Sequence, residues 1–418
     1  MRFNKYTLKI KNGNKTILYN VITKIMLEID CNITNVENEF FKNLTKEDEQ
    51  LYKEKLLISD DDNDDILQME KIKHTYNHQN EIGHFLIHLG YACNLKCTYC
   101  YQSTIESSDK IAKINSQKVV EFIAKSAKIN NFDMYDICFI GGEPLIYYPE
   151  IIEISSALNS LLGNKDIFYS VVTNGTLLND KYKINNLIKN GILDYQITID
   201  GPQNQHDKYR NNGKEGSFSQ IIKNIENILH NFPNIYLSLN CNLTEENSQS
   251  IDKLFQYLDS KKINIPIMFS MVFDNGKNIS LECHSHNTIW KDAHKTALKY
   301  GQQYTPFYRD LYLGCALTQE NYFIIGADGK LYKCINAINN KKYCVGDMEN
   351  YGSKEYNDKI KKFLKYEINQ KMCKECELYP VCFGGCEYRN SINGFQCDKK
   401  LFYENEIDII RMIANAGN

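Results

Sequence analysis

Three cysteines stand close together in the chain, at Cys93, Cys97 and Cys100. Thiolates at this spacing on one short loop indicate a metal centre, because soft sulfur ligands bind zinc and iron–sulfur clusters. Zinc prefers four ligands from paired CxxC turns, whereas three thiolates on a cubane of four irons leave one iron open to a small molecule. We therefore expect a 4Fe–4S cluster here, with zinc as the rival interpretation.

A second group of cysteines lies in residues 300–418, which hold eight of the 15 in the chain. The odd count, and an N-terminus without a continuous apolar segment, argue against a secreted disulfide framework. The region has little apolar periodicity, with short strands expected at 322–325 and 330–334. We expect it to be loop-rich and to need metal in order to fold.

The elements that must position the first group alternate between strand and helix over residues 82–290. Strands are expected at 84–90, 135–140, 168–173, 194–199, 235–241 and 267–273, and helices at 116–128, 149–162, 180–190, 218–230 and 247–259. Such alternation implies βαβ units and a parallel sheet, and six units make a partial (β/α)6 barrel.

Parallel-sheet enzymes place their chemistry at the carboxyl ends of the strands. The first cysteine group follows the first expected strand, Gly141–Pro144 follow the second, Asn174 and Gly175 the third, and Asp200 and Gly201 the fourth. We therefore expect these segments to meet at one edge of the sheet.

The string CNLKCTYCYQ, residues 93–102, resembles the signature of the radical S-adenosylmethionine (SAM) superfamily. The resemblance implies that the open iron binds the amino and carboxylate groups of SAM. Electron transfer from the cluster then releases a 5′-deoxyadenosyl radical, which abstracts hydrogen from the substrate. An external donor of the flavodoxin or ferredoxin type would supply the electron.

Further segments resemble motifs of the same superfamily. Gly141-Gly142-Glu143-Pro144 is similar to its GGEP turn, which implies that Glu143 accepts from the methionine ammonium and that the glycines permit close backbone approach. Thr173-Asn174-Gly175, and Thr198-Ile199-Asp200-Gly201-Pro202 with Arg210, are similar to its TNG and DGP segments. The SAM-contacting residues implied are Tyr99, Gly141, Gly142, Glu143, Thr173, Asn174, Thr198, Asp200 and Arg210. Thr198 and Asp200 would lie near the ribose and Arg210 would pair with the methionine carboxylate. Ordinary glycine turns and a surface arginine are the alternatives.

Seven C-terminal cysteines resemble the SPASM pattern, which binds two auxiliary 4Fe–4S clusters. The resemblance covers roughly residues 83–400. Auxiliary cluster II would take Cys373, Cys376, Cys382 and Cys397. Auxiliary cluster I would take Cys315, Cys334 and Cys386.

Two positions depart from the sulfatase-maturing branch of that family. Arg309 stands where the branch has a further cysteine, and Ile335 stands where it has a catalytic aspartate. Auxiliary cluster I would then have an open iron, which could hold a substrate cysteine thiolate, unless Cys344 or Cys283 substitutes. Both departures favour an enzyme that modifies a ribosomally made precursor peptide (a RiPP maturase). We expect Cys thioether cross-links first and C–C or C–O cross-links second, with formylglycine formation disfavoured.

Residues 1–80 lie outside the resemblance and predict a small α+β, winged-helix-like domain. A hairpin is expected from 6–10 and 16–21, and helices at about 23–29, 36–43 and 45–57. The acidic run 59–65 predicts a solvated turn. The domain could bind a leader peptide by strand addition, or it could be a cap without a ligand.

Composition bounds the remaining choices. The 418 residues suggest roughly three domains, at 1–80, 82–290 and 300–418, and 49 basic against 52 acidic residues give a net charge of −3. This balance gives no reason to expect nucleic acid or an anionic membrane as partner. No apolar run could span a bilayer, and we expect a cytoplasmic protein. A non-catalytic Fe–S electron-transfer protein is the alternative of another class, although it would not need Glu143 or Arg210.

Overall fold

The computed structural model describes residues 1–78, 81–100, 102, 113–272, 288–302, 315–364, 371–382, 384–395, 397 and 399–416. Two compact units make up the chain, and both are assembled from segments far apart in the sequence. The terminal unit comprises residues 1–78, 306–315 and 365–418. The barrel unit comprises residues 79–305 and 316–364.

Six parallel strands form the centre of the barrel unit and lie side by side in chain order. They are β6 (Ile82–His88), β7 (Met134–Ile140), β8 (Asp166–Thr173), β9 (Ile192–Thr198), β10 (Tyr236–Leu243) and β11 (Ile267–Met271). This confirms the expected parallel sheet, and about every second residue of each of β6 to β10 is buried.

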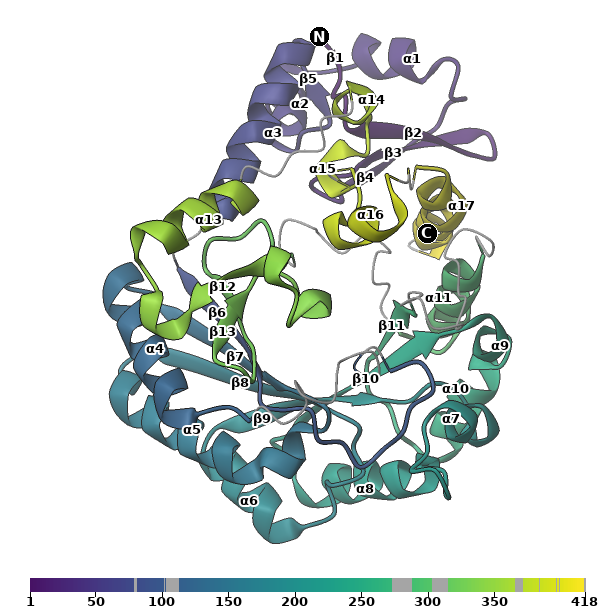
Figure 1. Ribbon diagram of the computed structural model, residues 1–418. Coiled ribbons are helices and arrows are strands. Elements are labelled where there is room, and N and C mark those ends of the chain that lie inside the picture. The colour runs from purple at the N-terminus through teal and green to yellow at the C-terminus, as the bar shows by residue number, and fades with distance from the viewer. Residues whose placement is uncertain are drawn as a thin grey trace. The chain divides into compact units, whose positions relative to one another are not determined.

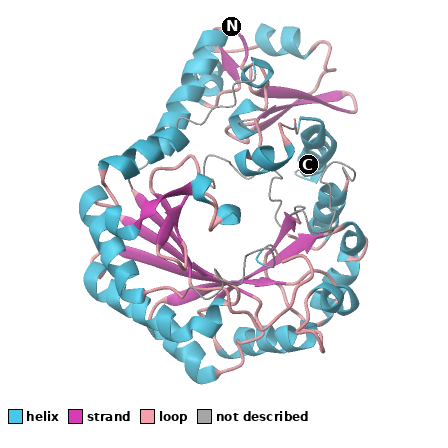
Figure 2. Ribbon diagram, in the orientation of Figure 1, coloured by secondary structure: helices cyan, strands magenta, loops and turns pink. Residues whose placement is uncertain are grey.

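Helices follow the strands and cover the outer side of this sheet, as Figures 1 and 2 show. They are α4 (Ser116–Asn130), α5 (Tyr148–Leu162), α6 (Lys181–Lys189), α8 (Phe218–Asn231) and α10 (Ile251–Ser260). The shorter η3 (Pro144–Tyr147), α7 (Gln203–Tyr209) and α9 (Glu245–Ser248) occupy strand-to-helix connections. The helix expected over 247–259 is found at Ile251–Ser260, and the separate α9 precedes it, with Thr244 and Asn247 forming a capping box at the N-terminus of α9.

Three further strands extend the sheet beyond β6. β12 (Tyr322–Ile325) runs parallel to β6, and β13 (Lys330–Tyr332) and β14 (Cys344–Asp347) follow as antiparallel neighbours. Short helices η4 (Ile335–Ala337), η5 (Lys341–Tyr343) and η6 (Met348–Asn350), then α13 (Lys354–Leu364), complete this part, and α11 (Ile289–Lys299) follows β11. One hydrophobic core cluster joins β6 and β7 to β12 and β13. Its buried members are Leu86, Ile140, Ala316, Ile324, Tyr332 and Ile338.

The terminal unit opens with an antiparallel sheet of β2 (Thr7–Asn12), β3 (Lys15–Asn20) and β4 (Met26–Ile29). The expected hairpin is confirmed, but the helix expected at 23–29 is wrong. The Asn20 side chain accepts from the N–H groups of Ile22 and Thr23, which turns the chain back. β4 then pairs with β3.

The acidic run 59–65 is not a solvated turn, and that prediction is wrong too. β5 (Ile58–Ser59) pairs with β1 (Arg2–Phe3), and Asp61 caps α3 (Asp62–Asn77). Asp65 is completely buried, where it binds Arg2, the Asn4 Nδ2 at 2.6 Å and the Lys5 N–H at 2.8 Å. α1 (Val36–Lys42) and α2 (Lys46–Glu54), the latter capped by Thr45, lie where helices were expected.

The C-terminal part of this unit is more helical than expected. It contains α14 (Lys371–Lys374), α15 (Tyr379–Cys382), α16 (Glu387–Asn393) and the 18-residue α17 (Lys399–Ala416). A shared core joins it to the N-terminal sheet, and the buried members of that core are Tyr6, Leu8, Ile10, Ile17, Tyr19, Val21, Met69, Leu378, Val381, Phe402, Ile407 and Ile410. Within the described ranges, the helices are too short or too polar to cross a membrane.

Candidate functional site

The loop with the first three cysteines leaves the carboxyl end of β6 and is held by the turn that follows β7. The Gly142 N–H donates to the Gly90 carbonyl at 2.9 Å, and the Glu143 N–H donates to the Ala92 carbonyl at 2.9 Å. A Cβ on Gly142 would lie 2.4 Å from the Ala92 oxygen, and one on Gly141 would lie 2.7 Å from the Gly90 oxygen. Both glycines are therefore required for the turn to lie against the start of the cysteine loop.

Glu143 is completely buried and joins this turn to the end of β8. Its Oε1 accepts from the Leu145 N–H at 3.0 Å and the Thr173 hydroxyl at 2.7 Å, and its Oε2 accepts from the Asn174 N–H at 2.7 Å. Burial raises the pKa of Glu143, and these hydrogen bonds act against the rise. A carboxylate has about four acceptor positions, so room for one further donor remains on Oε2.

Side-chain amides connect the cysteine loop to the turn after β8. The Asn174 Nδ2 donates to the Asn94 Oδ1 at 2.8 Å, and the Asn94 Nδ2 donates to the Thr176 hydroxyl at 2.8 Å. The Asn174 Nδ2 also lies 4.0 Å from the Cys93 sulfur. This network fixes the orientation of Cys93 relative to the third strand end.

A second network surrounds Tyr99, between the second and third cysteines. Its hydroxyl donates to the Asp200 carboxylate and accepts from the Arg210 NH1 at 2.8 Å and the Asn242 Nδ2 at 3.1 Å. Asp200 is completely buried, and its Oδ1 accepts from the Asn242 N–H at 2.9 Å. Burial raises the pKa of Asp200, while Arg210 lowers it. The Arg210 Nε is buried and has no hydrogen-bond partner among the described residues.

The segment after α7 supports the loop through its backbone. The Lys96 N–H donates to the Asn211 carbonyl at 2.7 Å, and the Thr98 N–H donates to the Tyr209 carbonyl at 3.0 Å. His206 on α7 accepts from the Asp200 N–H at 3.2 Å, and its other ring nitrogen lies 2.8 Å from the Ser217 hydroxyl. The cysteine loop is thus held from the ends of β7, β8, β9 and β10.

Three thiols on one short loop are the donor set that an iron–sulfur cluster takes. No three His, Cys, Asp or Glu side chains in the described ranges meet at one metal position. A cubane takes each thiolate on a different iron, so its ligands surround it without converging on one point. Burial raises the pKa of Cys97 to about 11 and also raises that of Cys93, while Arg210 acts to lower both. Bound iron would therefore have to hold these sulfurs as thiolates.

Every predicted residue of this first site lies at the expected edge of the sheet, and Thr198 is buried at the end of β9. Sequence reasoning missed Asn94, Thr176 and Asn242. Asn94 lies between two of the cysteines and Asn242 lies near the end of β10, so the strand-end rule could have found both.

The C-terminal cysteines divide between the two units. Cys334 and Cys344 belong to the barrel unit, and Cys315, Cys373, Cys376, Cys382, Cys386 and Cys397 belong to the terminal unit. Cys373 is buried, whereas Cys386 and Cys397 are exposed. Cys283 and Arg309 lie outside the described residues.

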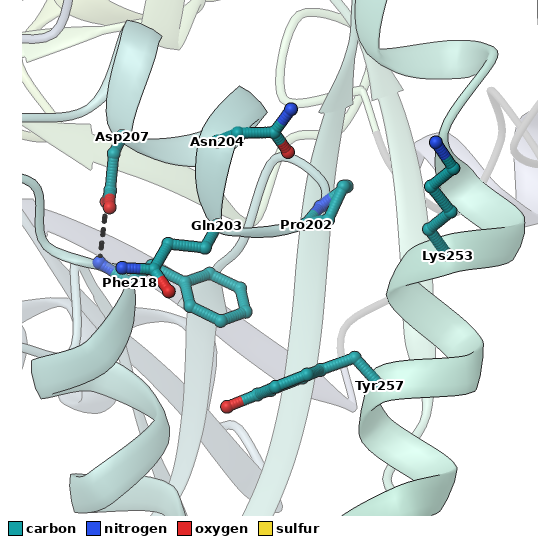
Figure 3. Close-up of a pocket in the computed structure, with 7 residues that line it drawn as sticks. All are labelled: Pro202, Gln203, Asn204, Asp207, Phe218, Lys253 and Tyr257. Atoms are coloured by element: carbon teal, nitrogen blue, oxygen red, sulfur yellow. Dashed lines mark hydrogen bonds between the residues drawn. The ribbon is translucent and has the colours of Figure 1, made fainter.

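A cavity of about 590 Å³ lies between α7, the start of α8 and α10 (Figure 3). The Asp207 carboxylate accepts from the Phe218 N–H at 2.9 Å here and so caps α8. The other lining residues are Pro202, Gln203, Asn204, Lys253 and Tyr257. None of the predicted site residues lines this cavity, so we do not place the chemistry there.

Comparisons with known proteins agree with this geometry. Residues 87–258 match the model of the Radical SAM superfamily. The chain is 28% identical over 365 residues to a cysteine-type anaerobic sulfatase-maturating enzyme of Clostridium novyi, covering 77% of this chain and 94% of that enzyme. It is 25% identical to the radical SAM cyclopropyl synthase TigE of Paramaledivibacter caminithermalis, covering 91% of this chain and 88% of TigE.

Two solved structures share the fold. Native anSMEcpe with bound AdoMet and Kp18Cys peptide has a TM-score of 0.64 and 21% identity, covering 80% of this chain and 99% of that chain. Streptococcus suis SuiB bound to its precursor peptide SuiA has a TM-score of 0.57 and 15% identity, covering 94% of this chain and 97% of SuiB. Residues 87–258 of this chain are therefore a radical SAM domain.

Proposed function

We propose that this enzyme is a peptide maturase that abstracts hydrogen from a ribosomally made precursor peptide and forms Cys thioether cross-links. The observation that carries the radical chemistry is the three-thiol loop at the carboxyl end of β6, held between buried Glu143 and buried Arg210. When bound, the cluster on Cys93, Cys97 and Cys100 and its SAM would supply the 5′-deoxyadenosyl radical.

The chain's own residues would bind and orient the methionine end of SAM. Glu143 keeps one acceptor position beyond its three protein donors, which suits an ammonium group. Arg210 has a buried Nε without a partner among the described residues, which suits a carboxylate. Tyr99 and Asp200 would hold Arg210 in place, because both lie within 4.0 Å of its NH1.

A peptide substrate is supported by the relatives. SuiB is described with its precursor peptide SuiA, and anSMEcpe with a Kp18Cys peptide. The three-stranded sheet of the terminal unit ends in β4, and an added leader-peptide strand could pair there. We further propose two auxiliary 4Fe–4S clusters, cluster I on Cys315, Cys334 and Cys386 and cluster II on Cys373, Cys376, Cys382 and Cys397. An external flavodoxin or ferredoxin would supply electrons.

Formylglycine formation on a sulfatase is the second candidate, favoured by the 28% identity to the Clostridium novyi enzyme. Against it, Ile335 follows Cys334 where the sulfatase-maturing pattern has an aspartate. An apolar side chain cannot accept the proton that such a step releases. We therefore place peptide cross-linking first.

The test of the radical site is iron and sulfide content after anaerobic purification, with 5′-deoxyadenosine formation under dithionite. We expect about twelve irons per chain in wild type, and about eight without deoxyadenosine in the Cys93/Cys97/Cys100→Ala variant. Zinc in place of iron, or no deoxyadenosine from wild type, would refute the proposal.

The substrate class is tested by mass spectrometry of two peptides. A Cys-containing precursor encoded beside the gene should lose two hydrogen atoms for each thioether, and a sulfatase-derived Cys peptide should stay unchanged. Conversion of the sulfatase peptide to an aldehyde would establish the second candidate instead.

A further inference from the structure

The proposed auxiliary cluster I has three assigned thiolates, and its fourth ligand is open. The sequence offers no cysteine at position 309, where the family pattern has one, because Arg309 stands there. The identity of the fourth ligand matters only if the proposed auxiliary cluster exists, so an assignment of that ligand rests on the proposed function.

The β13–β14 hairpin fixes where Cys334 lies relative to Cys344. Tyr332 on β13 is paired with Cys344 on β14, and the Lys333 N–H donates to the Tyr343 carbonyl at 3.0 Å. The ladder therefore continues one residue past β13. Cys334 remains extended, with φ −148° and ψ 128°, and Cys344 is extended too, with φ −80° and ψ 123°.

The pairing brings the two cysteines close together in the hairpin. Cys334 lies two residues after Tyr332, the residue that Cys344 faces across the ladder. The two cysteines are then diagonal neighbours across an antiparallel pair, about 7–8 Å apart at Cα and closer at Cβ. Lys333 and Tyr343, which lie between the two cysteines and their partners, are both buried. The register shift in this hairpin falls between Leu331 and Tyr332 and does not reach the Cys334 end.

Cys344 lies against the core cluster that joins the hairpin to β6 and β7. Cys344 and Ile335 both pack against the cluster of Leu86, Ile324 and Tyr332. Cys334 and Cys344 are each half-buried, so they are shielded from bulk water without being sealed in the core. Such partial burial suits thiolates that share a cluster, because the cluster itself fills the remaining space.

The other described cysteines of the barrel unit do not fit. Cys138 lies within β7, next to Ser170 in the neighbouring strand, and Cys241 lies completely buried within β10. Cys93, Cys97 and Cys100 belong to the radical site.

From this register we propose that Cys344 is the fourth protein ligand of auxiliary cluster I, beside Cys334 on the same hairpin. The cluster then has a thiolate on every iron. It can relay electrons but has no open iron for a substrate thiol, so substrate cysteines are not bound at this cluster.

The experiment uses the full-length Cys93/Cys97/Cys100→Ala chain as background, so that only auxiliary clusters contribute. Into it are placed Cys344→Ala, Cys344→Ser and, as the matched control from the same core cluster, Cys138→Ala. Iron content, Mössbauer spectra and EPR spectra of the dithionite-reduced clusters are recorded with and without 2-mercaptoethanol as an external thiol.

We expect the background and Cys138→Ala to hold about eight irons and to show spectra that the thiol does not change. Cys344→Ala should lose about one iron per chain, or keep it in a form whose spectrum changes when thiol is added. Cys344→Ser, which keeps an oxygen ligand, should hold its iron with a shifted spectrum even if the alanine variant folds poorly.

Two results would overturn the inference. One is a background spectrum that already changes on addition of thiol, and the other is Cys344 variants whose spectra match the background. A background chain without iron would instead refute the proposed auxiliary clusters, which keeps the two failures distinguishable.

Discussion

At the scale of single residues, the Tyr99 hydroxyl is the centre of the network that holds the cysteine loop. Tyr99→Phe removes the hydroxyl that donates to buried Asp200 and accepts from buried Arg210. Because buried polar groups lose partners, we expect a loss of about 1–3 kcal/mol in the free energy of unfolding. Anaerobic denaturant titration measures it.

Tyr209→Phe is the matched control for that variant, because its ring lies 6.3 Å from that of Tyr99 and its hydroxyl donates to exposed Glu246. Tyr209→Phe should lower the free energy of unfolding by no more than about 1 kcal/mol. Equal losses in the two variants would show that the Tyr99 network has no special role in stability.

His206 makes the barrel unit sensitive to acid. Burial lowers its pKa well below the ordinary value, so the folded protein holds it neutral. In the unfolded chain the imidazole takes up a proton below about pH 6.5, so this contribution to stability is complete above that pH and is lost as the pH falls. The maximal slope for one group is about 1.4 kcal/mol per pH unit.

The variant His206→Asn keeps an acceptor for the Asp200 N–H but removes the titration. At about pH 7.5 the variant should have a lower free energy of unfolding than the wild type. Between about pH 6.5 and 5.5 that free energy should fall less in the variant than in the wild type, as measured by denaturant titration at each pH. Burial lowers the pKa of His88 to about 4, so some slope remains. Exposed His230→Asn is the control, and an unchanged slope in His206→Asn would contradict the assignment.

At the scale of elements, β4 is the strand to which a leader peptide would add. The Asn20 N–H donates to the Ile25 carbonyl, so alternation directs the N–H of Leu27 toward β3 and that of Met26 away from it. On the other edge of the sheet, the Lys11 carbonyl of β2 already accepts from Arg411 at 2.8 Å. The outward backbone groups of β4 are therefore the ones we expect a peptide to use.

Met26→Pro removes one outward N–H without breaking the bonds to β3. Loss of one backbone hydrogen bond of about 1–1.5 kcal/mol should weaken leader binding about tenfold, measured by fluorescence anisotropy with a labelled leader. Met26→Ala shortens the same side chain, keeps the N–H and should bind nearly as wild type. Equal affinities of the proline and alanine variants would place the leader elsewhere, or show that the domain is a cap.

The elements that the sequence predicts well are those whose local pattern and tertiary role agree. Each barrel strand alternates buried apolar residues with less buried ones and pairs with the strand of the next βαβ unit, so its neighbours are close in sequence. β4 and α3 were missed because remote partners decide them: β3 orders Met26–Ile29, and Arg2 and Asn4 stabilise Asp65. Cysteines and glycine turns carry spacing signatures, whereas Asn94 and Asn242 act through amides that no short motif marks.

At the scale of the whole chain, the two ends of the sequence share one hydrophobic core. Tyr6, Leu8 and Ile10 of the N-terminal sheet belong to the same buried cluster as Leu378 and Val381. These last two lie between Cys376 and Cys382, two proposed ligands of auxiliary cluster II, and Cys376 itself packs against the cluster. A role of residues 1–78 in holding those cysteines follows from this packing, whether or not they bind a leader.

Deletion of residues 1–78 should therefore lower the iron content from about twelve to about eight per chain while uncoupled deoxyadenosine formation persists. Leu8→Ala, in a fully packed site, should cost about 2–5 kcal/mol and lose part of the same iron, and Ile66→Ala, 41% exposed, should cost little. Anaerobic iron assay and denaturant titration measure both. A deletion that keeps about twelve irons would mean that the C-terminal cysteines hold their cluster without the N-terminal sheet, and that the shared core serves stability alone.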